Sequence, residues 1–200
     1  MDSFIVPSNI SSKGVNRVLL SEGQIRSKVI ELGKAITDNY KGRKIVCLGV
    51  LNGSVTFIAD LIREINLEMY VDFVGVSRYM ENGEYKIKIR NKLGSHIEGN
   101  AVLIVEDIVD NGFTVEAIIK ELNTYSPASI EVCTLLHKKE AQKVELDVDY
   151  VAFEIPLEYV VGYGLDYEGL YRNLPYVGVL DDVVWDPEAT LKREKEENGK

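Results

Sequence analysis

The chain has 200 residues, of which 46% are hydrophobic and 28% are charged, and its formal net charge is −9. This composition indicates a soluble globular protein that can bury a substantial core. The negative charge argues against nucleic acid as the main partner, because phosphate backbones require a basic surface. No run of about 18 apolar residues occurs, so no membrane-spanning helix is predicted.

Two features bear on the cellular compartment. Cys47 and Cys133 lie far apart, each within an apolar run, and are predicted to be reduced core residues. The N-terminal sequence MDSFIVPSNI lacks the basic segment and long apolar stretch of a secretory signal. We therefore expect a cytoplasmic protein.

Residues 1–20 are weakly patterned and are predicted to be an N-terminal arm with one short apolar piece, Arg17–Leu20. Ser21 and Gln24 have capping-box spacing, which indicates the start of a helix. Apolar residues then recur at helical intervals up to about Tyr40, namely Ile25, Val29, Leu32 and Ile36.

A buried strand is predicted over Ile45–Val50, followed by a turn, Leu51-Asn52-Gly53-Ser54, and a helix that starts at Val55. By itself the Asn-Gly pair is only good turn chemistry. Met69–Val76 is predicted to be a second strand. Alternating residues from Ser77 to Ile89 surround Glu81-Asn82-Gly83-Glu84 and predict a hairpin with a tight turn.

Val102–Val105 is predicted to be a strand buried on both faces, with Glu106 and Asp107 after it and a polar turn, Asp110–Thr114, before the next helix. Such an arrangement points backbone N–H groups and a helix N-terminus at an anion. Gly112 would let the backbone approach closely, and Thr114 is predicted both to cap the helix and to bond a phosphate oxygen. The alternative is an ordinary turn, because these residue types favour turns in general. Three carboxylates in this stretch favour a phosphorylated sugar, since they accept hydroxyl hydrogen bonds and hold divalent cations.

Further apolar strands are predicted over Ile130–Leu136, Val151–Ile155 and Val177–Leu180. Strands that alternate with helical patterns indicate an α/β fold with a mostly parallel sheet flanked by helices. The lysines that follow His137 would most often lie in a solvated loop. Residues 191–200 are charged and predicted to be a frayed tail.

The stretch Val102–Thr114 resembles the phosphoribosyl pyrophosphate (PRPP) motif of the type I phosphoribosyltransferases, and more narrowly that of the hypoxanthine-guanine phosphoribosyltransferases. The likeness continues in order from about Ile45 to Leu180, through Leu51–Ser54, Phe57–Leu61, Val71–Phe73, Leu135–Lys138, Phe153–Pro156, Val160–Tyr167 and Arg172. It implies a single domain over residues 1–200, with a small hood and a flexible hairpin flap over residues 77–93.

The resemblance also implies roles in PRPP binding. Asp110 would be the catalytic residue, as general base at purine N7, while Glu106 and Asp107 hold the ribose hydroxyls. The backbone of Asp110, Asn111, Gly112, Phe113 and Thr114 would bind the 5′-phosphate. Leu51, Asn52 and Gly53 would bind pyrophosphate, with a cis peptide between Leu51 and Asn52, and Arg172 would clamp the departing pyrophosphate. Many relatives have a basic residue where this chain has Asn52, so backbone amides are the expected donors there.

For the purine, the resemblance implies that Lys138 donates to the exocyclic oxygen, Tyr159 stacks on the base and Val160 offers backbone contacts. By default such an aromatic residue belongs to the core. Asp166 would contact the base and, with Glu106 and Asp107, hold Mg²⁺. Ser77 and Tyr79 would belong to the flap, although Arg78 separates them. His137 matches no family role, and both His96 and His137 are predicted to be non-catalytic.

The implied function is purine salvage: hypoxanthine, guanine or both react with PRPP to give IMP or GMP and pyrophosphate. A xanthine- or guanine-preferring transferase is an alternative within the class. A PRPP-fold regulator that binds RNA or a nucleotide is disfavoured by the acidic composition, and a silent relative is disfavoured by the presence of Asp110. We expect a homodimer or homotetramer that binds neither nucleic acid nor membrane.

Overall fold

The computed structural model describes residues 12–81, 84–94 and 96–185. Two compact units are found along the chain: Met1–Ile25 with Glu158–Lys200, and Arg26–Leu157. The single domain expected over residues 1–200 stays a prediction. No helix in the described ranges is long and apolar enough to cross a membrane.

The larger unit contains a six-stranded sheet in the order β4-β3-β2-β5-β6-β7. All neighbouring strands are parallel except β3 and β4, which form the predicted hairpin. The tip of this hairpin at residues 82–83 lies outside the described residues. The strands are β2 (Ile45–Leu51), β3 (Met69–Glu81), β4 (Glu84–Ile89), β5 (Ala101–Val109), β6 (Ser129–His137) and β7 (Tyr150–Glu154). The predicted strands and their mostly parallel arrangement are therefore confirmed.

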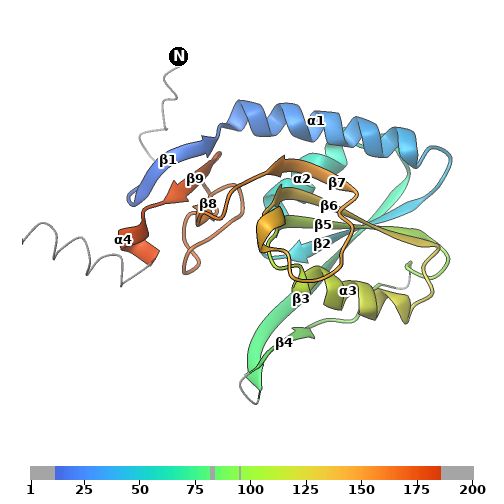
Figure 1. The fold of residues 1–200 in the computed structure, drawn as a ribbon. Coiled ribbons are helices and arrows are strands. Elements are labelled where there is room, and N and C mark those ends of the chain that lie inside the picture. The colour runs from blue at the N-terminus through green and yellow to red at the C-terminus, as the bar shows by residue number, and fades with distance from the viewer. Residues whose placement is uncertain (1–11, 82–83, 95, 186–200) are drawn as a thin grey trace, which may run out of the picture. The chain divides into compact units, whose positions relative to one another are not determined.

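Helices cover both faces of this sheet (Figure 1). They are α1 (Glu22–Asn39), α2 (Val55–Glu64) and α3 (Phe113–Asn123), with a short 3₁₀ turn η1 (Lys139–Ala141) after β6. The helix α3 packs Val115, Ile118 and Leu122 into a core with alternate residues of β2 and β5. The helix α2 lies on the opposite face, and Asn66 just after it donates its backbone N–H to Thr37 Oγ1 of α1 at 3.0 Å.

The predicted capping box is confirmed. The Ser21 backbone N–H donates to Gln24 Oε1 at 2.9 Å, and the Gln24 backbone N–H donates to Ser21 Oγ at 3.3 Å. The residues predicted to face the core from this helix are buried, namely Ile25, Val29, Leu32 and Ile36. Both cysteines are free and buried as predicted, and burial raises the pKa of the Cys47 thiol to about 12.

The smaller unit holds a three-stranded antiparallel sheet in the order β1-β9-β8. Its elements are β1 (Val15–Leu20), β8 (Val160–Val161), β9 (Val177–Leu180) and the helix α4 (Asp182–Trp185). The expected N-terminal arm therefore contains a strand, because Val15–Leu20 pairs with a segment near the other end of the sequence. Residues 1–11 and the charged tail at 191–200 lie outside the described residues.

Candidate active site

A cavity of about 270 Å³ opens where β2 and β5 end and α3 begins. Parallel strands bring their carboxyl ends to one edge of a sheet, which is where open α/β sheets bind ligands. The cavity joins the two turns that the sequence singles out, and its lining is Val50, Leu51, Gly53, Val76, Glu106, Asp107 and Thr114.

Asp107 lies directly against the turn after β2. A Cβ atom added to Gly53 would be 1.7 Å from Asp107 Oδ2, so any side chain at this position would collide with the carboxylate. The peptide bond between Leu51 and Asn52, in the same turn, is cis as predicted. The structure thus brings the predicted pyrophosphate turn and the predicted ribose-binding carboxylate into one site.

The turn after β5 continues into α3 through a glycine. Gly112 has φ +86° and is the N-cap residue, and Asn111 Oδ1 accepts the Phe113 backbone N–H at 3.2 Å. Thr114 therefore lies inside the first helical turn, and the prediction that it caps the helix is wrong. Glycine adopts this left-handed backbone readily, which lets the helix begin before the threonine. Thr114 still lines the cavity, and the helix N-terminus faces the same edge of the sheet.

Asp110 and Lys138 come together at the ends of β5 and β6. Lys138 Nζ is 3.7 Å from Asp110 Oδ2, and the Lys138 backbone N–H donates to Val109 O at 2.9 Å. The Lys138 side chain is 13% exposed, whereas that of Lys139 is 73% exposed. The expectation of a solvated loop is therefore correct for Lys139 and wrong for Lys138.

Glu106 is a buried carboxylate, with 6% of its surface exposed. Asp107 beside it is partly buried, and its Oδ1 accepts the Ile108 backbone N–H at 3.0 Å. In the described residues no group of three or more His, Cys, Asp or Glu side chains is placed to hold a metal ion. Of the three predicted metal ligands, Glu106 and Asp107 are neighbours and form an acidic pair. The third, Asp166, belongs to the other compact unit.

In the smaller unit Tyr159 is part of an aromatic group. Its ring stacks on Trp185 with centroids 5.3 Å apart and meets the Tyr167 ring edge-on at 5.7 Å. Burial and the nearby Asp166 carboxylate raise the pKa of the Tyr159 phenol. The prediction that an aromatic residue at this position belongs to the core is confirmed in part. Tyr159 is partly buried and packs against the cluster of Val161, Leu174, Tyr176 and Leu180. The sequence analysis missed Trp185, for which the only signal is that it is the sole tryptophan of the chain.

Asp166 and Arg172, which are predicted to have different roles, form an ion pair. Arg172 Nη2 is 2.7 Å from Asp166 Oδ1, and Arg172 Nη1 donates to Gly164 O at 2.6 Å. The other carboxylate oxygen of Asp166 accepts the Gly169 backbone N–H at 2.8 Å. Val160 is in β8, where it is buried and lies opposite Val179 of β9. These contacts fix the loop that follows β8.

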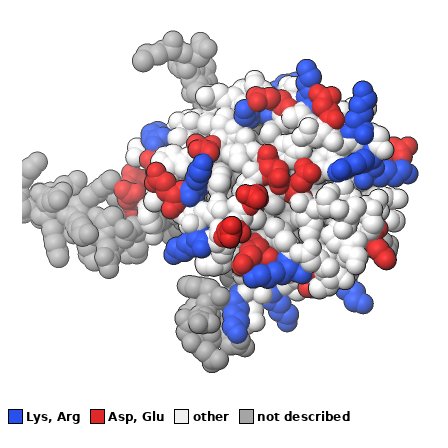
Figure 2. Space-filling view, turned by 45° about the vertical axis from the view of Figure 1, so that its right-hand side comes forward, with Lys and Arg blue, Asp and Glu red and all other residues white. Residues whose placement is uncertain are grey.

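The predicted flap residues Ser77 and Tyr79 lie on β3, opposite Lys88 and Lys86 of β4. They are two residues apart and share one face of the hairpin, despite the intervening Arg78. The Tyr79 side chain is exposed, and Ser77 Oγ donates to Lys88 O at 3.4 Å. The surface view shows lysine and arginine interspersed with aspartate and glutamate over the visible face (Figure 2).

Comparisons with known proteins identify the family. A family model of the phosphoribosyl transferase domain matches residues 19–168. A hypoxanthine-guanine phosphoribosyltransferase of Staphylococcus epidermidis is 45% identical over 175 residues, which cover 86% of this chain and 98% of the relative. The crystal structure of a hypoxanthine phosphoribosyltransferase from Staphylococcus aureus matches with a TM-score of 0.83 and 42% identity, over 86% of this chain and 95% of that chain. A hypoxanthine-guanine phosphoribosyltransferase from Bacillus anthracis, solved with HEPES in the active site, matches with a TM-score of 0.80 and 39% identity, over 83% of this chain and 99% of that chain. These matches confirm the predicted type I phosphoribosyltransferase fold, and the chain belongs to the hypoxanthine-guanine phosphoribosyltransferases within the phosphoribosyl transferase domain family.

Proposed function

We propose that this protein transfers the 5-phosphoribosyl group of PRPP to N9 of hypoxanthine or guanine, giving IMP or GMP and pyrophosphate. The observation that carries the proposal is the pairing of Lys138 with Asp110 at 3.7 Å, beside the turn that leads into α3. This pairing supports a site in which Lys138 donates to the purine oxygen while Asp110 accepts the purine proton.

In the proposed reaction, N9 bonds to C1′ of the ribose as the bond from C1′ to the pyrophosphate oxygen breaks. The proton on N7 passes to the Asp110 carboxylate, as in general base catalysis. Glu106 and Asp107 accept hydrogen bonds from the ribose hydroxyls and favour positive charge on the sugar in the transition state. The backbone of Asn111–Thr114 holds the 5′-phosphate at the helix N-terminus.

Three residues are proposed to recognise the purine. Lys138 donates to the exocyclic oxygen and rejects adenine, whose amino group cannot accept that hydrogen bond. Tyr159 stacks on the base and the Val160 backbone contacts it. Arg172 binds pyrophosphate through its guanidinium group. To do so, it gives up part of its ion pair with Asp166. Ser77 and Tyr79 close over the site with the hairpin and exclude water.

Mg²⁺ fits the acidic pair of this site. Magnesium takes oxygen ligands, and it usually binds through one or two carboxylates together with substrate phosphates. Glu106 is buried, Asp107 lies against Gly53, and both residues line the same cavity. We infer that Glu106, Asp107 and Asp166 hold the metal together with PRPP. The metal would neutralise charge on the leaving pyrophosphate.

The test is PRPP-dependent nucleotide formation with four bases: hypoxanthine, guanine, xanthine and adenine. We expect turnover of hypoxanthine, guanine or both, and little of adenine. Faster turnover of xanthine than of hypoxanthine would favour the xanthine-preferring alternative. No turnover of any base, with folded protein that binds PRPP, would favour the regulatory alternative.

We further propose a single-domain, cytoplasmic enzyme that works as a homodimer or homotetramer. Light scattering of the purified protein during size-exclusion chromatography measures the molar mass of the assembly. A monomer that has full activity would contradict the oligomeric part of this proposal.

A further inference from the structure

The loop between β6 and β7 lies beside the turn that precedes α3. The Lys143 backbone N–H donates to Asn111 O at 3.0 Å. Side chains of the same loop cover Gly112: a Cβ added there would be 2.6 Å from Val144 Cγ2 and 3.5 Å from Leu146 Cδ2. The position of the turn therefore depends on the position of residues 143–146.

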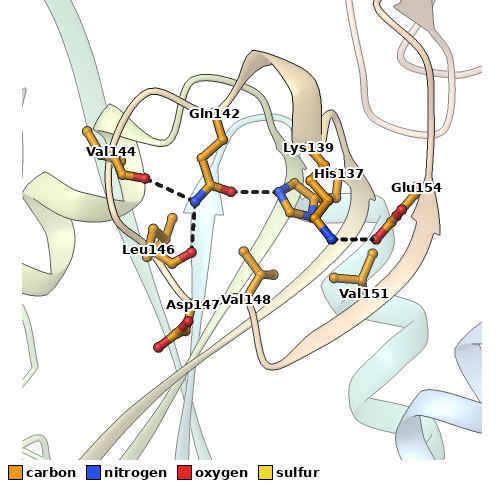
Figure 3. A pocket seen from close by; sticks show the side chains of 9 residues that line it. All are labelled: His137, Lys139, Gln142, Val144, Leu146, Asp147, Val148, Val151 and Glu154. Atoms are coloured by element: carbon orange, nitrogen blue, oxygen red, sulfur yellow. Dashed lines mark hydrogen bonds and ion pairs between the residues drawn. The ribbon is translucent and has the colours of Figure 1, made fainter.

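Gln142 holds this loop in place (Figure 3). Its Nε2 donates to Val144 O at 3.0 Å and to Leu146 O at 2.8 Å, and its Oε1 is 2.9 Å from His137 Nε2. Both N–H groups of the amide are used by the two carbonyls, so the amide oxygen must face the histidine and accept. His137 Nε2 therefore carries a proton.

His137 supplies a rigid anchor for Gln142. It is the last residue of β6, is 6% exposed, and lies opposite Val109 of β5 and Glu154 of β7. A continuous set of contacts thus runs from the end of the sheet through Gln142 to the loop, and from the loop to Asn111 and Gly112. The histidine keeps this contact whether its ring is the Nε2–H tautomer or the cation, because Nε2 donates in both.

We propose that Gln142 is a positioning residue for the phosphate-binding turn, anchored by His137. The inference rests on the proposed function, in which residues 111–114 bind the 5′-phosphate of PRPP. Backbone amides bind an anion tightly only when they already point at it, and the apparent affinity falls with the fraction of molecules in the competent shape. Gln142 raises that fraction without touching the substrate.

The first test is Gln142→Met, which keeps the length of the side chain and removes its three hydrogen bonds. We expect the KM for PRPP to rise about tenfold, which corresponds to a competent fraction of about one tenth. The KM for hypoxanthine should stay within about twofold, since Lys138 is held by its own backbone bond to Val109. The control is Lys139→Met. Lys139 lies in the same segment between β6 and β7, but its side chain is exposed, so this change should leave both KM values unchanged (Figure 3).

A second variant, Gln142→Glu, keeps an acceptor for His137 but places a carboxylate against two carbonyl oxygens. It should loosen the loop while retaining the histidine contact, so it should also raise the KM for PRPP. In both variants hydrogen exchange of the Lys143 and Thr114 amides should be faster than in the wild type, with circular dichroism unchanged. Equal loss of affinity for PRPP and hypoxanthine, or an unchanged KM for PRPP in either folded variant, would overturn the inference.

Calorimetry of the wild type with PRPP and Mg²⁺ separates this inference from the proposed function. If the wild type does not bind PRPP, the proposed function fails. If the wild type binds PRPP and Gln142→Met binds it equally well, the role of Gln142 alone is wrong.

Discussion

Asp110 and Lys138 form an ion pair. In the proposed reaction Asp110 contacts N7 of the purine, and Lys138 contacts its exocyclic oxygen. The Asp110 side chain is 47% exposed, and the 3.7 Å separation is long for a charge-assisted hydrogen bond. The long separation and the half-exposed Asp110 make this a weak ion pair. Both side chains can therefore turn to an incoming base at small energetic cost.

Asp110→Ala should lower kcat about a hundredfold or more, because the proton acceptor at N7 is removed. Steady-state turnover of hypoxanthine and PRPP measures the effect. The control is Asp38→Ala, which removes an exposed carboxylate from α1 and should leave kcat unchanged. An Asp110→Ala enzyme with wild-type kcat would remove the proposed role.

Lys138→Met should raise the KM for hypoxanthine by about ten- to a hundredfold, since a hydrogen bond to a charged group is lost. Discrimination against adenine should relax in parallel, because the donor that rejects the amino group is gone. The matched control is Lys139→Met, whose side chain is exposed. Competition assays with adenine and hypoxanthine measure the base preference, and an unchanged preference would count against Lys138.

Among the elements, β7 is tied to α1 and β6 through Tyr150. Its hydroxyl accepts from Asn39 Nδ2 at 2.9 Å and donates to Glu131 Oε2 at 3.0 Å. Burial, followed by the Glu131 interaction, raises the pKa of Tyr150 to about 12 from the ordinary 10.0. The folded state thus binds this proton more tightly than the unfolded state does. Its contribution to stability is complete below about pH 10 and is lost as the pH rises towards 12.

Tyr150→Phe should therefore lower the free energy of unfolding at pH 7, by about 1 kcal/mol for each hydrogen bond lost. Between pH 10 and 12, where Tyr150 itself titrates, the deficit relative to the wild type should shrink. Urea unfolding at a series of pH values measures the difference. A deficit that stays constant or grows with pH would contradict the assignment of the raised pKa.

The stacked pair of Tyr159 and Trp185 provides an optical test of the hood. Trp185 is the only tryptophan, so intrinsic emission above the tyrosine band comes from this position alone. A purine that stacks on Tyr159 changes the surroundings of the indole, and we expect saturable quenching or a shift of the emission. Tyr159→Leu should abolish this change and weaken base binding. Base binding that proceeds with constant emission would place the purine elsewhere.

At the scale of the whole molecule, ligand binding should be visible as stabilisation. PRPP at about a hundred times its Kd contributes about 2.7 kcal/mol, which raises the Tm of a chain of this size by about 5–10 °C. With Glu106 and Asp107 as proposed metal-holding residues, removal of Mg²⁺ by EDTA should reduce the shift. Thermal denaturation with PRPP, with and without Mg²⁺, measures it. An equal shift in EDTA would contradict the metal assignment.

The local sequence predicts much of the larger unit, since its signals depend on neighbouring residues. The apolar run before Glu106 becomes the buried β5. In the smaller unit, likewise, the Ser21–Gln24 spacing becomes a capping box. The turn between Leu51 and Ser54 precedes α2 as predicted. Each of these patterns is read within one or two helical turns or one strand, so no distant contact is needed to interpret it.

The sequence alone determined the fold class, the family and the residues that meet at the ends of β2 and β5, because periodicity and motifs are local properties of the chain. Only the tertiary structure decided that Val15–Leu20 is a strand, that Lys138 is largely shielded while Lys139 is exposed, and that Trp185 stacks on Tyr159. It also placed the loop that Gln142 holds against the turn at Asn111, through the Lys143 backbone N–H. These features depend on contacts between segments that are distant in sequence, and burial and pairing of that kind arise only when the chain is folded.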